Sequence, residues 1–241
     1  MKIGIITDIH SNIQALNAVL NEFDKVKVDK IICCGDIIGI GINPEETVQK
    51  LMTKRELLIA VKGNHEQYLL DGLPKEVHDN KRNMSINEIK NHEWNHKKLS
   101  EESKEFLNEL ELSKYIEIEG KILYLIHYPV KENGTYKKHI KKPNIIECRE
   151  MFCEINADIY LFGHTHTSII NNEGNKWYIN TGTLGCPGKN NIANAGLLEI
   201  NNGKVKFANI KIEYDVKEII EEMNRQKFPH YEKIMQIFYG K

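Results

Sequence analysis

The sequence predicts an α/β fold, in which buried strands alternate with helices and end in polar turns. Three short apolar runs, 2–7, 30–34 and 58–61, each lead into such a turn, with the sequences D-I-H, G-D and G-N-H. Apolar residues at helical spacing follow the first run, and a predicted helix, 44–54, with Pro at its first position follows the second. Strand, polar turn and helix in succession is how an open α/β sheet presents chemistry at the carboxyl ends of its strands.

The first twelve residues, MKIGIITDIHSN, show this arrangement most clearly. The apolar run 2–7 leads into Asp8 and His10, which are two residues apart and therefore project to the same side of an extended segment. Ser11 and Asn12 then offer an N-cap for the following helix. This stretch predicts that a carboxylate and an imidazole leave the end of one buried strand together.

A polar region rich in Asn and Lys, from about 79 to 112, has the pattern of two helices. The sequence SEES that begins at Ser100 is interpreted as a capping box at the start of the second helix. Apolar residues recur along both helices, which favours an ordered amphipathic pair over a disordered segment. The predicted apolar stripe consists of Ile86, Ile89, Trp94, Leu99, Phe106, Leu107 and Leu110.

The second half of the chain is richer in strands. A hairpin is predicted to turn at Glu119-Gly120 and to run directly into His127, and another buried strand ends in G-H-T-H at 163–166. Turn-forming pairs and alternating patterns indicate antiparallel strands after that point. The predicted elements are strands at 115–118 and 121–126, a helix at 145–156, a strand at 157–162, antiparallel strands within 168–212, and one or two helices within 216–239.

Length and composition restrict the domain organisation and the class of partner. A chain of 241 residues without an internal repeat or a linker predicts one domain, 1–241, large enough to bury a real core. The net charge of −1 gives no global reason to expect nucleic-acid or membrane binding. Five cysteines fit neither a disulfide framework nor a CxxC zinc site, and neither a signal peptide nor a membrane span is evident. A cytoplasmic location is therefore expected.

Polar residues at the strand ends form a set with metal-binding chemistry. Carboxylates, imidazoles and one amide oxygen, without a thiolate, suit divalent Mn, Fe, Zn, Co or Ni. The set is too large for one ion and about right for two, which at a separation of roughly 3.5–4 Å can clamp a phosphate and activate a bridging water for in-line attack. The predicted residues are Asp8, His10, Asp36, Asn64, His65, His127, His164 and His166.

Three members of this set receive a role from the sequence. Asp36 is the expected bridge between the ions, because a carboxylate has two oxygens and its turn lies centrally. The side chains of the neighbours Asn64 and His65 point in different directions, so Asn64 can bind metal while His65 faces the substrate as a general acid. Catalysis is therefore predicted to depend on Asp36 and His65.

The blocks D-x-H, G-D, G-N-H-E, H and G-H-T-H, in this order between Asp8 and Pro187, resemble the calcineurin-like metallophosphoesterase superfamily. The sequence is similar in particular to the small prokaryotic phosphodiesterase branch. The resemblance implies a four-layer α/β/β/α sandwich of two mixed β-sheets flanked by helices, with the metals at the strand ends and His65 as the catalytic histidine. It also implies two ligand sets: Asp8, His10, Asp36 and His166 for one ion, and Asp36, Asn64, His127 and His164 for the other.

Two positions depart from the pattern of that family. The segment 180–187 reads NTGTLGCP where the family has N-P-G-S, so Thr stands in place of both Pro and Ser. This difference concerns the substrate rather than the metal ligands. Glu66 stands where Asp is commoner, at a position that does not usually bind metal.

The predicted function is that of a metal-dependent phosphoesterase, a hydrolase that cleaves phosphodiester bonds by attack of a metal-bridging water. Its cofactors would be two divalent ions, with Mn as the first candidate and Fe, Zn, Co or Ni as the others. The expected partner is a small phosphorylated substrate, which could be derived from a nucleotide, and neither a membrane nor a nucleic acid. Activity should fall at acid pH, because imidazoles bind metal in their neutral form.

Three alternatives remain open. A phosphomonoesterase, either a protein phosphatase or a nucleotide phosphatase, uses the same centre and differs in pocket shape. A DNA nuclease of this superfamily normally carries extra domains, which neither the length nor the net charge indicates. A non-catalytic scaffold of the same fold is disfavoured by the complete ligand set and by His65.

Several residues outside the ligand set receive a structural interpretation. The basic run 137–142 is a solvated face unless it borders the cleft, where it could attract a phosphorylated substrate. Cys186 has no His partner in its sequence context and is assigned a structural role. The loop with Gly39 and Gly41 lacks the Lys-Ser/Thr of a P-loop and is interpreted as a tight turn. The histidines assigned to the surface or to packing are His78, His92, His96, His139 and His230.

Apolar residues in the C-terminal helices leave the oligomeric state open. They could dock on the sandwich or on a second subunit of a homo-oligomer, and the sequence does not decide between the two. These residues are Phe228, Ile234, Ile237 and Phe238.

Overall fold

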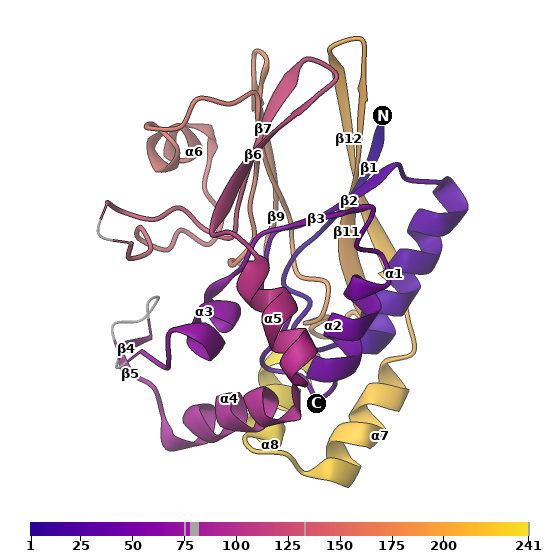
Figure 1. Ribbon diagram of the computed structural model, residues 1–241, viewed down its shortest axis with the longest axis vertical. Helices are drawn as coiled ribbons and strands as arrows, with labels where there is room; N and C mark the ends of the chain where they lie inside the picture. Colours follow the sequence, from indigo (N-terminus) through magenta and orange to yellow (C-terminus); the bar gives the residue numbers. More distant parts are fainter. Residues whose placement is uncertain (75, 78–81, 133, 241) are drawn as a thin grey trace.

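The computed structural model describes residues 1–74, 76–77, 82–132 and 134–240. Two mixed five-stranded sheets face each other, and helices lie on their outer faces (Figure 1). The fold is thus the four-layer α/β/β/α sandwich that the sequence predicted.

The first sheet contains the strands that begin the chain. In the order β12-β11-β1-β2-β3, its strands are β12 (Lys204–Glu213), β11 (Ile192–Asn201), β1 (Lys2–Ile6), β2 (Lys30–Cys33) and β3 (Leu58–Ala60). β1, β2 and β3 are parallel, and β11 is antiparallel to β1. The turns after β1 and β2 are joined directly, since the backbone N–H of Asp8 donates to the carbonyl of Gly35 at 3.0 Å. This bond places the two polar turns side by side.

The second sheet supplies the remaining polar strand ends. In the order β6-β7-β8-β10-β9, its strands are β6 (Ser113–Ile118), β7 (Lys121–Ile126), β8 (Ile159–Leu161), β10 (Lys176–Thr181) and β9 (Ser168–Glu173). β8 is parallel to both β7 and β10, whereas the other pairs are antiparallel. The N–H of Gly163 donates to the carbonyl of His127 at 2.8 Å, so the turns after β7 and β8 also meet.

Alternation of side chains along the strands divides the core into layers. Ile3 and Ile5 of β1 belong to the core between the sheets, together with Leu125 and Leu161, whereas Ile6 belongs to the core under the helices. Helices α1 (Ile13–Val26), α2 (Pro44–Met52) and α5 (Glu101–Glu109) pack on the first sheet, and α6 (Ile145–Met151) packs on the second. α6 is shorter than the predicted helix 145–156, because the chain turns at Phe152 to enter β8.

The stretch of chain that links β3 of the first sheet to β6 of the second differs from its prediction at its beginning. The elements after β3 are α3 (Asn64–Leu70), the short strands β4 (Glu76–Val77) and β5 (Arg82–Asn83), α4 (Ile86–Lys98) and α5. Helix therefore begins at Ile86 and not near 79, and part of the expected segment, 79–81, lies outside the described residues. Ile86 does not join the predicted apolar stripe, since it is 71% exposed.

Only one of the two hydrogen bonds of the capping box predicted at Ser100 is formed, so that prediction is wrong in part. The Ser100 side chain does accept from the N–H of Ser103, but that third helical residue has no carboxylate, so Glu45 of α2 accepts from the N–H of Ser100 instead, at 2.9 Å. The reciprocal box occurs at Ser85 and Glu88, where α4 begins.

The C-terminal segment packs back on the chain. It consists of α7 (Val216–Gln226), α8 (Tyr231–Ile234) and a π-helical turn, η1 (Met235–Tyr239). Phe228 and Ile234 are buried in a cluster with Ile42, and Trp94 of α4 lies 5.4 Å from Phe228 between ring centroids. The sequence left open whether these residues dock on the sandwich or on a second subunit. Phe228 and Ile234 pack on the sandwich, whereas Ile237 is 54% exposed.

Among the described residues, no helix is both long enough and apolar enough to span a bilayer. The cytoplasmic location, the single-domain organisation and the oligomeric state remain predictions.

Candidate metal centre

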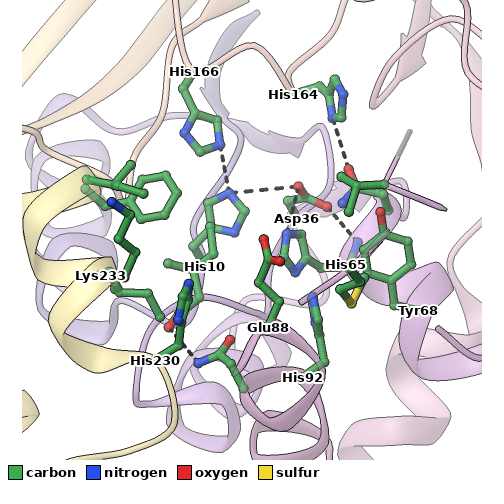
Figure 2. A pocket seen from close by; sticks show the side chains of 18 of the residues that line it. His10, Asp36, His65, Tyr68, Glu88, His92, His164, His166, His230 and Lys233 are labelled. Carbon is green, nitrogen blue, oxygen red and sulfur yellow. Dashed lines mark hydrogen bonds and ion pairs between the residues drawn. The ribbon is translucent and has the colours of Figure 1, made fainter. Parts of the chain in front are cut away.

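The eight polar strand-end residues meet at one edge of the two sheets. The first sheet supplies Asp8 and His10 after β1, Asp36 after β2, and Asn64 and His65 at the start of α3; the second supplies His127 after β7 and His164 and His166 after β8. Figure 2 shows that several of these side chains point toward one another around Asp36. The structure therefore brings together all the residues that the sequence proposed as ligands or as the catalytic histidine.

Four residues, which we call the amide subsite, gather closely: Asp36, Asn64, His127 and His164. The Nε2 atom of His127 lies 3.1 Å from Asp36 Oδ2 and 3.2 Å from His164 Nδ1, which in turn lies 3.0 Å from Asn64 Oδ1. A metal ion with bonds of about 2.1 Å holds its neighbouring donors at about this spacing. The amide subsite therefore fits one divalent ion.

A second group, which we call the Asp8 subsite, comprises Asp8, His10, Asp36 and His166. The Nε2 atoms of His10 and His166 face each other at 2.9 Å, and His166 Nε2 lies 3.3 Å from Asp8 Oδ1. Asp36 Oδ2, which also faces His127, is 3.8 Å from His10 Nε2. One carboxylate oxygen is thus common to both groups, and the two groups are the ligand sets that the resemblance implied. Their ligation of metal remains a prediction.

Five of these residues have left-handed backbone conformations. The φ angles are 54° at Asp8, 48° at His10, 53° at Asp36, 71° at His164 and 55° at His166. Residues with a Cβ lose about 1–2 kcal/mol in this region, and such strain concentrates at functional sites. The left-handed conformation directs each donor toward the centre. Residue types and spacing do not reveal this feature.

The turn that carries Asp36 is held by a buried carboxylate. Glu66 accepts from the backbone N–H groups of Asp36 and Ile37, both at 2.9 Å, of Ile38 at 3.1 Å and of Gly63 at 2.7 Å. Burial, with the charge of Asp36 second, raises the pKa of Glu66 to about 7 against the pull of these bonds. From the sequence, Glu66 was expected to be only a mild change from the commoner Asp. Its position as the third residue of α3 is, however, typical of a capping box.

The charge states of the ligands are set by burial and by one another. Burial lowers the pKa of His10 to about 4, so its imidazole is neutral and free to bind a cation at pH 7. Burial would also lower the pKa of His127, but the charge of Asp36 and the hydrogen bond to it raise that pKa to about 9. Burial raises the pKa of Asp36, but the charges of His127 and His65 lower it by more. The pKa of Asp36 therefore lies well below its usual value. A cation that binds here must displace the proton on His127.

His65 stands beside the subsites and is held from two sides. Its backbone N–H donates to Asp36 Oδ1 at 3.0 Å, and its ring Nδ1 has no hydrogen-bond partner among the described residues. Gly39, with φ of +82°, lies against the ring: a Cβ there would be 1.9 Å from Nδ1. Burial holds the pKa of His65 well below its usual value, so its imidazole is neutral at pH 7. The predicted tight turn at 39–41 therefore makes room for His65.

Three histidines that were expected at the surface or in packing lie close to the metal centre. His92 of α4 is buried with its ring centroid 5.0 Å from that of His65, and His230 lines the same pocket. Their positions depend on how α4 and the C-terminal segment dock, and residue spacing carries no signal of this. His139 also lies near the centre, 5.6 Å from His164 between ring centroids, whereas His78 is outside the described residues.

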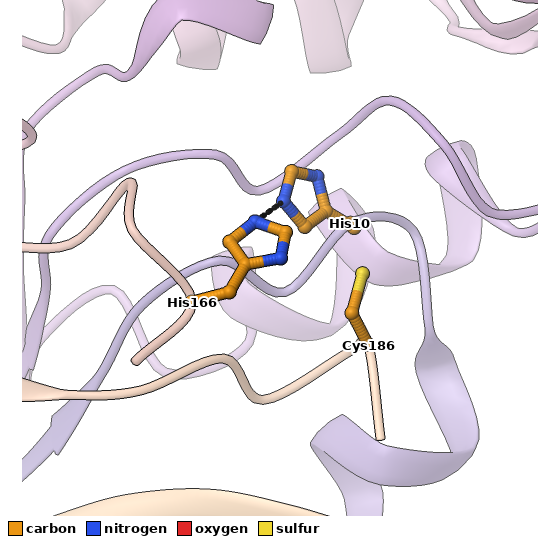
Figure 3. A group of neighbouring side chains, drawn as sticks. All are labelled: His10, His166 and Cys186. Carbon is orange, nitrogen blue, oxygen red and sulfur yellow. Dashed lines mark hydrogen bonds between the residues drawn. The ribbon is translucent and has the colours of Figure 1, made fainter. Parts of the chain in front are cut away.

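Cys186 also has partners that the sequence did not suggest. It is buried beside His10 and His166, and the potential ligand atoms of the three residues all lie within 4.8 Å of one another (Figure 3). Thr183 fixes this loop, since its Oγ1 accepts from the N–H of Cys186 at 3.1 Å and donates to the carbonyl of Asp8 at 2.9 Å. The segment 180–187 thus packs against the Asp8 subsite.

A pocket of about 270 Å³ opens above the metal centre (Figure 2). Its floor is made of ligand residues and His65, and its walls come from α3 to α4 on one side and from the C-terminal segment on the other. None of the basic run 137–142 is among the described lining residues; Lys137 instead donates to the carbonyl of Met151 at 3.0 Å. The wall residues include Ile40, Tyr68, Arg82, Met84, Glu88, His92, His230, Lys233, Ile237 and Phe238.

Comparisons with known proteins agree with this geometry. A family model described as the calcineurin-like phosphoesterase superfamily domain matches residues 1–203. An uncharacterized protein of Methanocaldococcus jannaschii is 30% identical over 245 residues, covering 95% of this chain and 94% of that protein. A hypothetical protein of Pyrococcus horikoshii has a similar structure (TM-score 0.81, 18% identity, 98% of this chain and 97% of that one). So does a metallophosphoesterase of Sphaerobacter thermophilus (TM-score 0.74, 23% identity, 99% of each chain).

Proposed function

The chain belongs to the calcineurin-like phosphoesterase superfamily, and on this premise we propose that it hydrolyses phosphodiester bonds of small molecules with the aid of two divalent ions. The observation that carries the proposal is the position of Asp36 Oδ2, which lies 3.1 Å from His127 Nε2 in one subsite and 3.8 Å from His10 Nε2 in the other. A carboxylate in that position can serve two ions at once. Nitrogen and oxygen donors of this kind suit Mn first, and also Fe, Zn, Co or Ni.

When bound, the ions would supply positive charge to the phosphoryl oxygens and lower the pKa of a water between them. The residues of the chain orient the donors for this purpose. His127 Nδ1 donates to the carbonyl of Cys34 at 2.8 Å, which leaves Nε2 as the atom that faces the centre. Thr7 Oγ1 donates to Asp8 Oδ2 at 2.8 Å and so fixes that carboxylate.

His65 would act on the phosphoryl group. At neutral pH its imidazole is neutral because it is buried, and a neutral imidazole has one N–H to donate. The sequence suggested a general acid, but a histidine in this position can also stabilise charge on the transition state, and the neutral state of His65 favours this second role.

The charges of the pocket favour a diester over a monoester. A phosphodiester carries a single negative charge, whereas a monoester at neutral pH carries nearly two. Among the described wall residues Arg82 is already paired with Glu88, at 2.8 and 2.5 Å, which leaves Lys233 as the cationic side chain without a carboxylate partner. A phosphomonoesterase remains the second candidate, because the same centre serves both reactions.

The test is hydrolysis of bis(4-nitrophenyl) phosphate against 4-nitrophenyl phosphate, with protein stripped by a chelator and reloaded with manganese. Faster turnover of the diester is expected. Faster turnover of the monoester would put the phosphatase first. Two bound ions without turnover of either ester would point to a scaffold, and failure to bind any metal would refute the proposal.

A further inference from the structure

The wall of the pocket opposite His92 is built by the C-terminal segment. His230, Lys233, Ile237 and Phe238 line the cavity, all from residues beyond the region that the family model matches. In Figure 2, Lys233 and His230 lie on one side of His10, while Tyr68 and His92 lie on the other. A ligand that fills the pocket above the metal centre therefore contacts this wall.

The wall is fixed in place rather than loosely attached. Asn91 of α4 donates to the carbonyl of Pro229 at 3.1 Å, and Gly188 donates to the carbonyl of Phe238 at 2.8 Å. The buried hydroxyl of Tyr239 donates to the carbonyl of Gly185 at 3.3 Å, in the loop behind the Asp8 subsite. The pocket is thus preformed, and its shape can select substrates.

Two kinds of surface face the cavity on this side. Ile237 and Phe238 are apolar, and Ile40 and Met84 extend the apolar lining beyond the segment. Ile237 is 54% exposed, which leaves apolar area for a ligand to cover. The ammonium group of Lys233 donates to the neutral amide of Gln236 at 3.0 Å and forms no ion pair with a described carboxylate. The cavity has a volume of about 270 Å³, close to the lower limit for small-molecule sites.

We propose that the substrate is a small phosphoester whose organic group is apolar and carries a second anion, a carboxylate or a phosphate, that Lys233 binds. This inference rests on the proposed function. The apolar part lies against Ile237 and Phe238 while the phosphoryl group lies at the metal centre. Lys233 and Ile237 then determine specificity without taking part in the chemistry.

The charge of Lys233 is tested with three methyl aryl phosphodiesters that differ only in the aryl group, which is phenyl, 4-carboxyphenyl or 4-(aminomethyl)phenyl. The variant Lys233→Glu is compared with wild type, both loaded with manganese, in 0.15 M salt, and release of the phenol is measured. An exposed charge pair changes kcat/KM by about three- to fivefold, and reversal of the charge removes one pair and creates one of opposite sign for each charged ester, so the preference for the carboxylate over the ammonium ester should fall by about a hundredfold in the variant. Lys217→Glu on α7, outside the described pocket lining, is the matched control, and screening should leave its preference unchanged.

The apolar surface is tested by Ile237→Ser, which should raise KM for the phenyl ester by about tenfold. Ile170→Ser on β9 is the matched control, since Ile170 has a similar exposure of 47% and does not line the pocket. Turnover with an unchanged charge preference in Lys233→Glu, or with an unchanged KM in Ile237→Ser, would overturn this inference and leave the proposed function standing. Metal-loaded wild type that hydrolyses none of the esters would overturn both.

Discussion

The amide subsite and the Asp8 subsite share Asp36 but differ in how closely their donors are gathered. In the amide subsite three donor pairs lie 3.0 to 3.2 Å apart, and the Asp36, His127 and His164 donors all lie within 4.8 Å of one another. In the Asp8 subsite the measured donor separations run from 2.9 to 3.8 Å. Burial does not separate the two subsites, since each has one partly exposed histidine, His164 in the amide subsite and His166 in the Asp8 subsite.

The difference indicates how much each subsite must rearrange to bind an ion. Donors already near the spacing of a coordination sphere need little movement, whereas His10 and Asp36 of the Asp8 subsite must approach each other. We therefore expect the amide subsite to bind its ion more tightly than the Asp8 subsite. The following predictions test or refine that comparison.

Loss of the shared ligand should remove the difference altogether. Asp36→Asn keeps the shape of the side chain but takes away the negative charge that both subsites use, so both ions should be lost or greatly weakened. Activity should fall by about a thousandfold or more, as for loss of a main electrostatic element. Metal analysis after gel filtration and steady-state kinetics measure the two effects. An Asp36→Asn protein with two tightly bound ions would contradict the shared role.

His65→Ala should separate chemistry from metal binding. Alanine retains the backbone N–H that donates to Asp36 Oδ1 and loses only the ring, whose Nε2 lies 3.9 Å from Asp36 Oδ2, so both subsites should keep their ions. Turnover should fall by about 10²- to 10⁴-fold. Should this variant match Asp36→Asn in metal content, His65 would have to be a ligand and not a catalytic group.

Single-ligand variants should reveal the asymmetry. His166→Ala removes a donor of the Asp8 subsite alone and should leave one ion bound about as tightly as the stronger ion of wild type. His127→Ala should leave one ion bound at the weaker affinity. Calorimetric titration with manganese gives both numbers, and equal residual affinities in the two variants would refute the ranking of the subsites.

The proton on His127 predicts an opposite pH dependence for the metal-free and the metal-loaded protein. Its pKa is raised from 6.5 to about 9 by Asp36 against the effect of burial, so the metal-free fold gains stability that is complete below pH 6.5 and is lost as the pH rises through 9. Metal binding needs the neutral ring, so the ion should stabilise the fold more as the pH rises. Thermal unfolding with and without manganese from pH 6 to 9 measures this, and a constant metal-induced shift would be inconsistent with it.

The smallest effect should come from Cys186→Ser. Its thiol borders His10 and His166 but not the amide subsite, so the affinity of the Asp8 subsite should change by about tenfold or less and that of the amide subsite should not change. Cys153→Ser, at an exposed cysteine, is the control. If Cys186→Ser lost the more tightly bound ion instead, the thiol would have to act on the amide subsite, and the prediction would be wrong.

The sequence predicted most sheet strands and the residues that gather at the candidate metal centre because both depend on short local patterns. Asp8 and His10 follow a strand within a few residues, and parallel strands bring such ends to one edge without further information. The packing of two mixed sheets between layers of helices followed from the resemblance, and the structure confirms it, whereas the strand order within each sheet was not predicted.

What the sequence missed depends on contacts between segments far apart in the chain. Glu45 replaces the partner that the box at Ser100 lacks, and it lies 55 residues away. Cys186 and His92 reach the centre only through the docking of a loop and a helix. The left-handed backbone at the ligands is likewise a result of the assembled site, because isolated turns of these residues would relax.

The left-handed backbone at the ligands has a consequence for the life of the protein in a cell. Glycine, the usual remedy for such strain, cannot replace these residues because each must supply a donor. At about 1–2 kcal/mol apiece, the strain is a sizeable share of the roughly 5–15 kcal/mol that holds a domain folded. Ions bound at the proposed subsites would offset it, since the unfolded chain has no assembled site. When metal is scarce, newly made chains should therefore be cleared by proteases sooner, so that abundance follows metal supply; a pulse-chase measurement of half-life under chelation tests this, and an unchanged half-life would argue against it.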